Sequence, residues 1–284
     1  MWDEKGHIVT NYHVVEGASK VMVTVATPVY DADGGHTFKH DQYDSEICGT
    51  DSANDVAVLK VNGPFNTFLP IEKGRLHGLE IGEPVYAVGN PWGLDHSMSA
   101  GIVSGLQREM KSRLNCPIFD VIQIDAAVNP GNSGGPLVDA HGEIIGMTTA
   151  TLSDSSSSAG VGFVVALSKI TSSVQSILVS GAVTRAGLGI EIMPSVLSPD
   201  FNVGTGVLIL EVSKPSLAYN AGLRGSNDLN HGVPVGDIIL RIDDVVIHRD
   251  VDLYVALKEY DVGDTVNITV KNMVLLILSR CNIT

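Results

Sequence analysis

Short β-branched segments separated by turn residues dominate the first 165 residues of the chain. Val, Ile and Thr favour extended backbone, whereas Gly, Pro and Asn interrupt it. Such segments, with no long helical period between them, are typical of a β-sandwich or β-barrel. They are HIVT, VMVTV, DVAVLKV, EPVYAV, FDVIQI, GEIIGMTT and VGFVV. The sequence therefore predicts an all-β first domain, with an exposed polar loop at 153–158 between its last two strands.

The hydrophobic period changes after this region. Ile170, Val174, Ile177 and Leu178 recur at helical spacing, and Gly181 follows as a helix stop. Beyond this helix, strand-like and short helical segments alternate up to residue 272. That size and pattern predict a small α+β module.

The segment 273–284 ends the chain with an apolar run followed by polar residues. We expect this run to be either a closing strand of the module or an exposed, aggregation-prone tail. It is far shorter than the ~20 residues that a transmembrane helix requires. Nothing else in the chain resembles a transmembrane helix, and its first residues do not resemble a signal or transit peptide.

Composition narrows the function classes. The 284 residues, of which 44% are hydrophobic, can bury the core of two domains. With 18 basic and 32 acidic residues, the net charge of −14 argues against nucleic-acid binding, which needs a basic face. The three cysteines are widely spaced and lack a metal-binding pattern, so we expect neither a disulfide framework nor structural zinc.

The motif GNSGGP at 131–136 places Ser133 among three glycines. Glycine tolerates positive φ, so such a run can aim successive backbone N–H groups at one point beside the serine oxygen. That arrangement stabilises the oxyanion of an acyl-transfer reaction. Taken alone, the motif is equally consistent with a glycine-rich surface turn.

Two upstream residues favour the catalytic interpretation. His13 follows an apolar strand in TNYHVV, and Asp55 begins another in NDVAVLKV. The order His, Asp, Ser is that of chymotrypsin-type proteases, in which the histidine is the base and the carboxylate orients it. Individually, His13 is also compatible with a core histidine and Asp55 with a turn residue.

The motifs TNYHVV, NDVAVLKV, AVGNPWG and DAAVNPGNSGGPL resemble those of the HtrA/DegP family of ATP-independent serine endopeptidases. Within that family the chain is similar to the chloroplast Deg proteases of plants, notably those of the thylakoid lumen. The resemblance implies an all-β chymotrypsin-like double β-barrel followed by an α+β PDZ domain. The implied boundaries are 1–168 for an N-terminally incomplete trypsin-like protease domain, 169–184 for a connecting helix, 185–272 for the PDZ domain and 273–284 for an atypical tail.

The resemblance also implies roles for individual residues. Ser133 would be the nucleophile, His13 the general base and later acid, and Asp55 its orienting carboxylate. The backbone N–H groups of Gly131 and Ser133 would form the oxyanion hole.

The specificity pocket and the peptide-binding loop are implied in the same way. Val128 and Thr151 would line the pocket for the residue before the cleaved bond, which predicts cleavage after Val, Ala or Thr. The segment RAGLGI resembles the carboxylate-binding loop of PDZ domains. There, Gly187, Leu188 and Gly189 would offer N–H groups, and the strand from Ile190 would pair with an extended peptide.

The function that this resemblance implies is degradation of unfolded or damaged proteins without ATP, metal or organic cofactor. The expected state is a trimer-based homo-oligomer or a mixed Deg complex in the thylakoid lumen. Because a strand and a targeting peptide expected before the histidine strand are absent, a catalytically impaired chaperone or assembly partner is the alternative. His36 and His40, near Asp41 and Asp44, leave a weak metal site conceivable, although we expect a solvated loop there.

Overall fold

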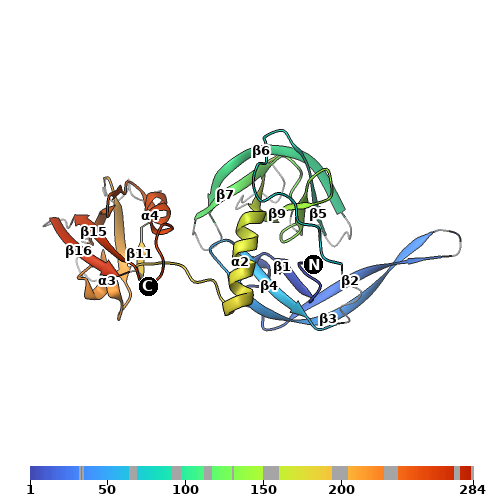
Figure 1. Ribbon diagram of the computed structural model, residues 1–284, viewed down its shortest axis with the longest axis horizontal. Helices are drawn as coiled ribbons and strands as arrows, with labels where there is room; N and C mark the ends of the chain where they lie inside the picture. Colours follow the sequence, from blue (N-terminus) through green and yellow to red (C-terminus); the bar gives the residue numbers. More distant parts are fainter. Residues whose placement is uncertain are drawn as a thin grey trace. The chain divides into compact units, whose positions relative to one another are not determined.

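The computed structural model divides the chain into two compact units, Met1–Val183 and Thr184–Thr284. Figure 1 shows a β-rich fold in each unit. The residues described are 1–31, 33, 35–63, 69–90, 97–111, 117–129, 131–149, 160–193, 204–226, 236–271 and 276–282. The expected polar loop at 153–158 lies outside these residues.

A four-stranded antiparallel sheet opens the first unit, in the order β1-β4-β3-β2. Its strands are β1 (His7–Thr10), β2 (Val21–Tyr30), β3 (His36–Asp51) and β4 (Val56–Val61). The one-turn helix α1 (Tyr12–Val15) follows β1. Strand β4 is fully buried at Val56, Ala57 and Val58, because it pairs with β1 on one edge and β3 on the other and packs into the hydrophobic core.

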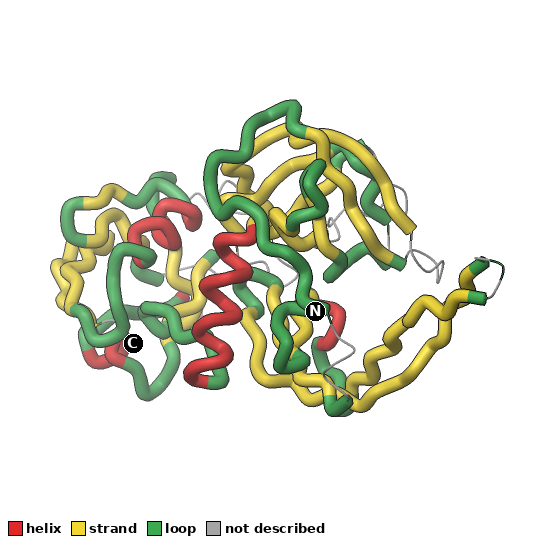
Figure 2. Tube along the Cα trace, turned by 45° about the vertical axis from the view of Figure 1, so that its right-hand side comes forward, coloured by secondary structure: helices red, strands yellow, loops and turns green. Residues whose placement is uncertain are grey.

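Strands β2 and β3 continue past the sheet as a long two-stranded ribbon (Figures 1 and 2). Their pairing runs without interruption from Val21 opposite Ser45 to Tyr30 opposite His36. The solvated loop expected around His36 and His40 is therefore wrong, because these residues lie in β3. Four consecutive polar residues separate Phe38 from Tyr43 in that stretch, and regular pairing with β2 overrides their turn preference.

The six strands that follow close into a barrel in the order β10-β7-β6-β5-β8-β9. They are β5 (Pro84–Gly89), β6 (Ser97–Lys111), β7 (Pro117–Ile124), β8 (Pro136–Val138), β9 (Ile144–Thr149) and β10 (Gly162–Ala166). Val85, Val103, Ile124 and Leu137 are fully buried inside it. The segment between β7 and β8 carries Ser133.

All seven strand segments predicted from the sequence are confirmed, and the first unit is all-β apart from its two helices. The sequence missed β3, β6 and β8. Strand β6 contains Ser, Gly and charged residues, and its pairing with β7 shifts register at three points, so no clean alternation marks it. One of the two expected barrels is closed, whereas the strands before it form an open four-stranded sheet.

The predicted helix is α2 (Leu167–Ser180). Ile170, Val174 and Ile177 are buried as expected, but Leu178 is 41% exposed and lies off the packed face. Gly181 ends the helix at φ 76°, and its N–H donates to the Ile177 carbonyl at 2.8 Å. The helix packs on β3, β4 and β9, so it belongs to the first unit and is more than a connector (Figure 1).

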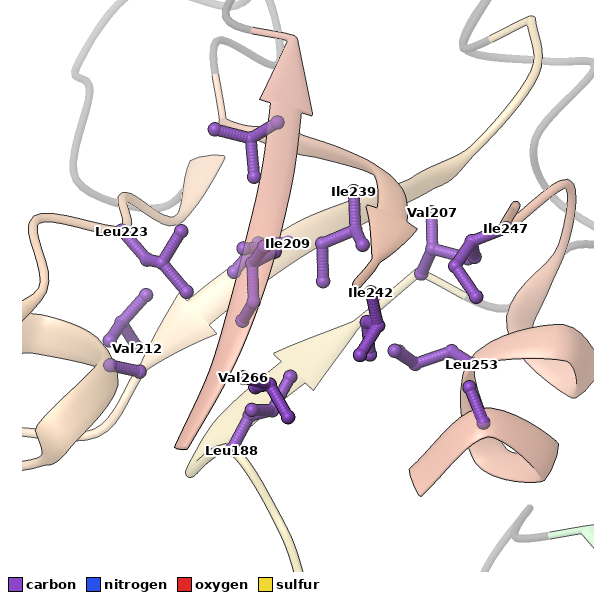
Figure 3. Close-up of a cluster of buried hydrophobic side chains, with 14 residues drawn as sticks. Leu188, Val207, Ile209, Val212, Leu223, Ile239, Ile242, Ile247, Leu253 and Val266 are labelled. Carbon is purple, nitrogen blue, oxygen red and sulfur yellow. The ribbon is translucent and has the colours of Figure 1, made fainter. Parts of the chain in front are cut away.

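The second unit is a six-stranded sheet, in which β11-β12-β13-β15-β16 follow one another and the short β14 pairs with β13. Its elements are β11 (Ile190–Ile192), β12 (Val207–Val212), α3 (Leu217–Asn220), β13 (Ile238–Ile242), β14 (Val245–Val246), α4 (Asp250–Leu257), β15 (Thr265–Lys271) and β16 (Leu276–Asn282). Figure 3 shows Ile209 and Ile242 of the sheet packing with Leu253 of α4. The α+β module predicted from the sequence is therefore present.

The two alternatives for the end of the chain are resolved in favour of a strand. Strand β16 pairs with β15 in unbroken register from Lys271 opposite Leu276 to Thr265 opposite Asn282. Among the described residues, no helix combines the length and the apolar character needed to cross a membrane.

Candidate active site

His13 is held against Asp55 at two points. Asn11 follows β1 in an extended conformation and is the N-cap of α1, which places His13 in the first helical turn. The His13 backbone N–H donates to Oδ1 of Asp55 at 2.9 Å, and ring nitrogen Nδ1 lies 2.7 Å from Oδ2. Two contacts to one carboxylate fix both the position and the rotation of the imidazole. The arrangement leaves Nε2 as the nitrogen available for proton transfer.

Asp55 itself adopts an unusual backbone conformation. It has φ 55°, a left-handed value that costs energy for a residue other than glycine, and it is only 6% exposed. Its carbonyl accepts hydrogen bonds from the Asn11 side-chain amide at 3.0 Å and from the Tyr12 N–H at 3.2 Å. These contacts offset the strain and direct the carboxylate toward His13.

Thr149 is a part of this site that the sequence analysis missed. Its hydroxyl donates to Oδ2 of Asp55 at 2.8 Å, from the last residue of β9. Thr149 is almost fully buried, so this hydrogen bond is shielded from water. A threonine pair ending the otherwise apolar strand IIGMTT was the available signal, but threonine is also common in strands for its shape alone.

The loop that carries Ser133 is built on glycine. Gly131 has φ 104° and Gly134 has φ 83°, values that other residues rarely adopt. The Asn132 N–H donates to the Asn129 carbonyl at 3.0 Å, and the Gly135 N–H donates to the Asn132 carbonyl at 2.9 Å. The N–H groups of Gly131 and Ser133 donate to no acceptor among the residues that the structure describes.

Strand β9 ties the serine loop to the histidine side of the site. Gly134 donates to the Thr148 carbonyl at 2.9 Å, and Thr148 donates back to the Gly135 carbonyl at 2.9 Å. A Cβ atom at Gly134 would collide with Oγ1 of Thr10, which lies three residues before His13. The neighbour of Thr148 in β9 is Thr149, the donor to Asp55. His13, Asp55 and the Ser133 loop thus meet around one strand end, although no described hydrogen bond joins Ser133 to His13.

Comparison with known proteins identifies the class of this arrangement. Residues 1–147 match the family model described as "Trypsin-like peptidase domain". The chain belongs to the trypsin-like serine proteases of the HtrA/DegP family. This membership confirms the resemblance drawn from the sequence motifs.

Several relatives place the chain within the family. It is 41% identical over 272 residues to "Protease Do-like 1, chloroplastic" of Arabidopsis thaliana, covering 95% of the chain and 59% of that protein. It is 37% identical over 231 residues to "Probable periplasmic serine endoprotease DegP-like" of Chlamydia trachomatis, covering 78% of the chain and 42% of that protein. The chain spans about three fifths of the length of the first of these relatives.

A solved structure of the family agrees with the fold. The structure named "HtrA-type protease AlgW with decapeptide" matches with a TM-score of 0.73 and 29% identity. The match covers 100% of this chain and 80% of that one.

Of the two residues predicted to line the specificity pocket, Val128 lies within the described residues. Val128 is half-buried next to Gly162 of β10. A Cβ atom at Gly162 would lie 2.7 Å from Cγ2 of Val128 and 3.0 Å from Cγ1 of Ile124. The wall there is consequently apolar and closely packed. Thr151, the other predicted pocket residue, lies outside the described residues.

Metal ligation has no geometric support in the described part of the chain, where no group of three or more His, Cys, Asp or Glu side chains could hold an ion. His40 lies opposite Ala26 on the β2–β3 ribbon. The described side chains of that ribbon therefore form no such group.

The predicted peptide-binding loop of the second unit precedes β11. Leu188 is buried in the core, and Gly189 has φ 68° with its carbonyl accepting from the Ser213 N–H at 3.0 Å. Ile190 begins β11, which pairs with β12 and stands at the end of the sheet order. Gly187 precedes them and is half-buried.

Proposed function

We propose that this protein is an ATP-independent serine endopeptidase that degrades unfolded or damaged proteins. The observation that carries the proposal is the two-point hydrogen bonding of His13 to Asp55, beside a glycine loop in which two N–H groups have no acceptor among the described residues. A histidine that is merely buried in a core needs one hydrogen-bond partner. A histidine that acts as a general base must also have its ring held in a fixed orientation.

In the proposed mechanism, Oγ of Ser133 attacks the scissile carbonyl carbon while Nε2 of His13 takes the hydroxyl proton. The oxyanion that forms accepts hydrogen bonds from the N–H groups of Gly131 and Ser133. His13 then gives its proton to the leaving amine, which departs from an acyl-enzyme. Water, deprotonated by His13, releases the acyl group and restores Ser133.

Asp55 stabilises the imidazolium form of His13 throughout these steps and keeps Nδ1 protonated. Thr149 holds the carboxylate of Asp55 from the other side. These steps require no metal, nucleotide or organic cofactor.

We further propose that the second unit is a PDZ domain that binds extended peptides. Strand β11, at the end of the sheet order, offers its backbone for pairing with an added strand. The N–H groups of Gly187, Leu188 and Gly189 would receive a terminal carboxylate. The related protease AlgW, whose structure is named as a complex with a decapeptide, supports peptide binding in this family.

Assembly and location follow the relatives. We propose a trimer-based homo-oligomer or a mixed complex with other Deg subunits, acting in the chloroplast and specifically in the thylakoid lumen. Two of the matched Arabidopsis thaliana relatives, Protease Do-like 1 and 8, carry the word chloroplastic in their names.

Degradation of casein, a loosely folded protein, tests the proposal. The purified chain and Ser133→Ala would be compared with and without EDTA and with and without ATP. We expect wild type to cleave in all conditions and the alanine variant to lose up to about 10⁶-fold in turnover. Failure of both to cleave, with peptide binding retained, would support the alternative of a catalytically impaired chaperone or assembly partner.

A further inference from the structure

A second buried carboxylate lies just before the proposed catalytic one. Asp51 ends β3, opposite Val56 of β4, and is 1% exposed. Its Oδ1 accepts from the Asn54 backbone N–H at 3.2 Å, and its Oδ2 accepts from the Asn54 side-chain amide at 3.0 Å. Asp51 therefore closes the β3–β4 turn from inside, at the residue that directly precedes Asp55.

A helix supplies the third hydrogen bond to this carboxylate. Ser173 of α2 donates its hydroxyl to Oδ2 of Asp51 at 2.6 Å, and it accepts from the Asn54 amide at 3.3 Å. Ser173 is 1% exposed on a helix face that is otherwise packed with Ile170, Val174 and Ile177. A polar side chain on an apolar helix face costs stability unless its hydrogen bonds are made.

The helix is a firm anchor for this contact. Ile170, Val174 and Ile177 pack in one buried cluster with Val56 and Val58 of β4. A Cβ atom at Gly49 of β3 would lie 2.8 Å from Cγ2 of Ile177, so β3 and α2 approach closely. Ser173 thus fixes the turn relative to the same hydrophobic core that holds β4.

We propose that Ser173 and Asp51 are positioning residues for Asp55. They clamp the turn so that Asp55 keeps its left-handed backbone and its carboxylate faces His13. The inference rests on the proposed function, because it assigns these residues to the same reaction. Neither residue touches a reacting atom; each acts through Asn54 and the backbone that joins it to Asp55.

The variant Ser173→Ala tests the clamp with little risk to folding, because alanine suits a helix and leaves the apolar packing in place. Ser176→Ala is the matched control, since Ser176 is half-buried one turn further along α2 and its hydroxyl donates within the helix, to the Ser172 carbonyl at 3.0 Å. Asp51→Asn and the double variant Asp51→Asn/Ser173→Ala complete a cycle that measures the coupling.

Two readouts separate positioning from mere stability. The first is kcat and KM on a peptide substrate, normalised to the fraction of Ser133 that a fluorophosphonate probe labels. The second is the far-downfield proton resonance of the His13 Nδ1–H, which reports directly on its hydrogen bond to Asp55.

We expect Ser173→Ala to lower the normalised kcat by about tenfold, since misplacement of a catalytic group slows turnover, and to leave KM within about twofold. The His13 resonance should move, and Ser176→Ala should match wild type in both readouts. In the Asp51→Asn background, Ser173→Ala should cause little further change in the normalised kcat or in the His13 resonance.

A normalised kcat and a His13 resonance unchanged in Ser173→Ala would overturn the inference. Failure of the proposed function would look different, since wild type would then neither cleave nor become labelled at Ser133. The His13 resonance would still decide the positioning question in that case, because it needs no turnover.

Discussion

The hydroxyl of Thr149 and the carboxylate of Asp55 share a 2.8 Å hydrogen bond across a separation of 94 residues. The acceptor is Oδ2, the same oxygen that lies 2.7 Å from the His13 ring. Thr149 belongs to the closed barrel, whereas Asp55 directly precedes β4 of the four-stranded sheet. One side chain thereby joins the two halves of the first unit at the proposed catalytic carboxylate.

Removal of that hydroxyl should impair catalysis more than folding. Thr149→Val keeps the shape of the side chain but deletes the donor to a charged acceptor, a contact worth about 1.5–3 kcal/mol. We expect kcat/KM to fall at least about tenfold on this basis. Thr149→Ser, which retains the hydroxyl, should stay near wild type. Equal kinetics for the valine and serine variants would rule out a role for this hydrogen bond.

Substitution of Gly134 should be far more damaging than substitution of Gly142. Both glycines have positive φ, near 83° and 81°, so alanine costs each about 1 kcal/mol of backbone strain. At Gly142 a Cβ atom meets nothing within 4 Å, but at Gly134 it collides with Thr10. Gly134→Ala should lose a further ~1–3 kcal/mol in chemical denaturation, together with hydrolytic activity. Similar losses for both variants would contradict the close packing inferred between the serine loop and β1.

Widening the pocket should relax specificity. Val128→Ala removes two methyl groups opposite Gly162, and pocket differences of this size alter discrimination by ~1–3 kcal/mol. A peptide library should show wild type cleaving after Val, Ala or Thr, with the variant shifted toward Leu and Met. Val161→Ala is the control, because Val161 adjoins Gly162 but is 40% exposed. A wild-type profile dominated by Arg, Lys or large aromatic residues would exclude the pocket assignment.

Acid should destabilise the second unit through Asp243. Hydrogen bonds from the Asn267 backbone N–H at 2.9 Å, the Asn267 amide at 2.7 Å and the Tyr260 hydroxyl at 2.8 Å hold the pKa of Asp243 below its ordinary value. The carboxylate thus stabilises the fold above the unfolded pKa of about 3.9 and loses this effect as pH falls through the lower folded value.

Thermal unfolding of Asp243→Asn checks the direction of this pH dependence of stability. The variant should melt below wild type at pH 7, and the difference should shrink under acid. Asp244→Asn, at the exposed neighbouring position, should show no such pH-dependent difference. A gap between wild type and Asp243→Asn that stays constant across this pH range would contradict the assignment.

The residues of the proposed site are easier to recognise in the sequence than the residues that support them. His13, Asp55 and Ser133 stand in short motifs, because a nucleophile, its base and the backbone that presents them impose local constraints. Thr149, Asp51 and Ser173 have no such signature. Each is a polar residue in an ordinary strand or helix, and its importance comes from a partner distant in sequence.

The missed strands have a similar explanation. Strand β3 is polar and exposed over much of the ribbon, and β6 is interrupted by register shifts, so neither shows the short β-branched run that identified β4. Leu178 matches the helical period but lies beyond the packed face of α2, because only the tertiary contacts define where that face ends.

The most direct test of the central claim is to map where a fluorophosphonate probe reacts with the full chain, by mass spectrometry of its peptides. A functional Ser133, His13 and Asp55 arrangement predicts selective modification of Ser133 in wild type and near-complete loss of that modification in His13→Ala. An unmodified Ser133 in folded wild type, or equal modification in both proteins, would contradict the account.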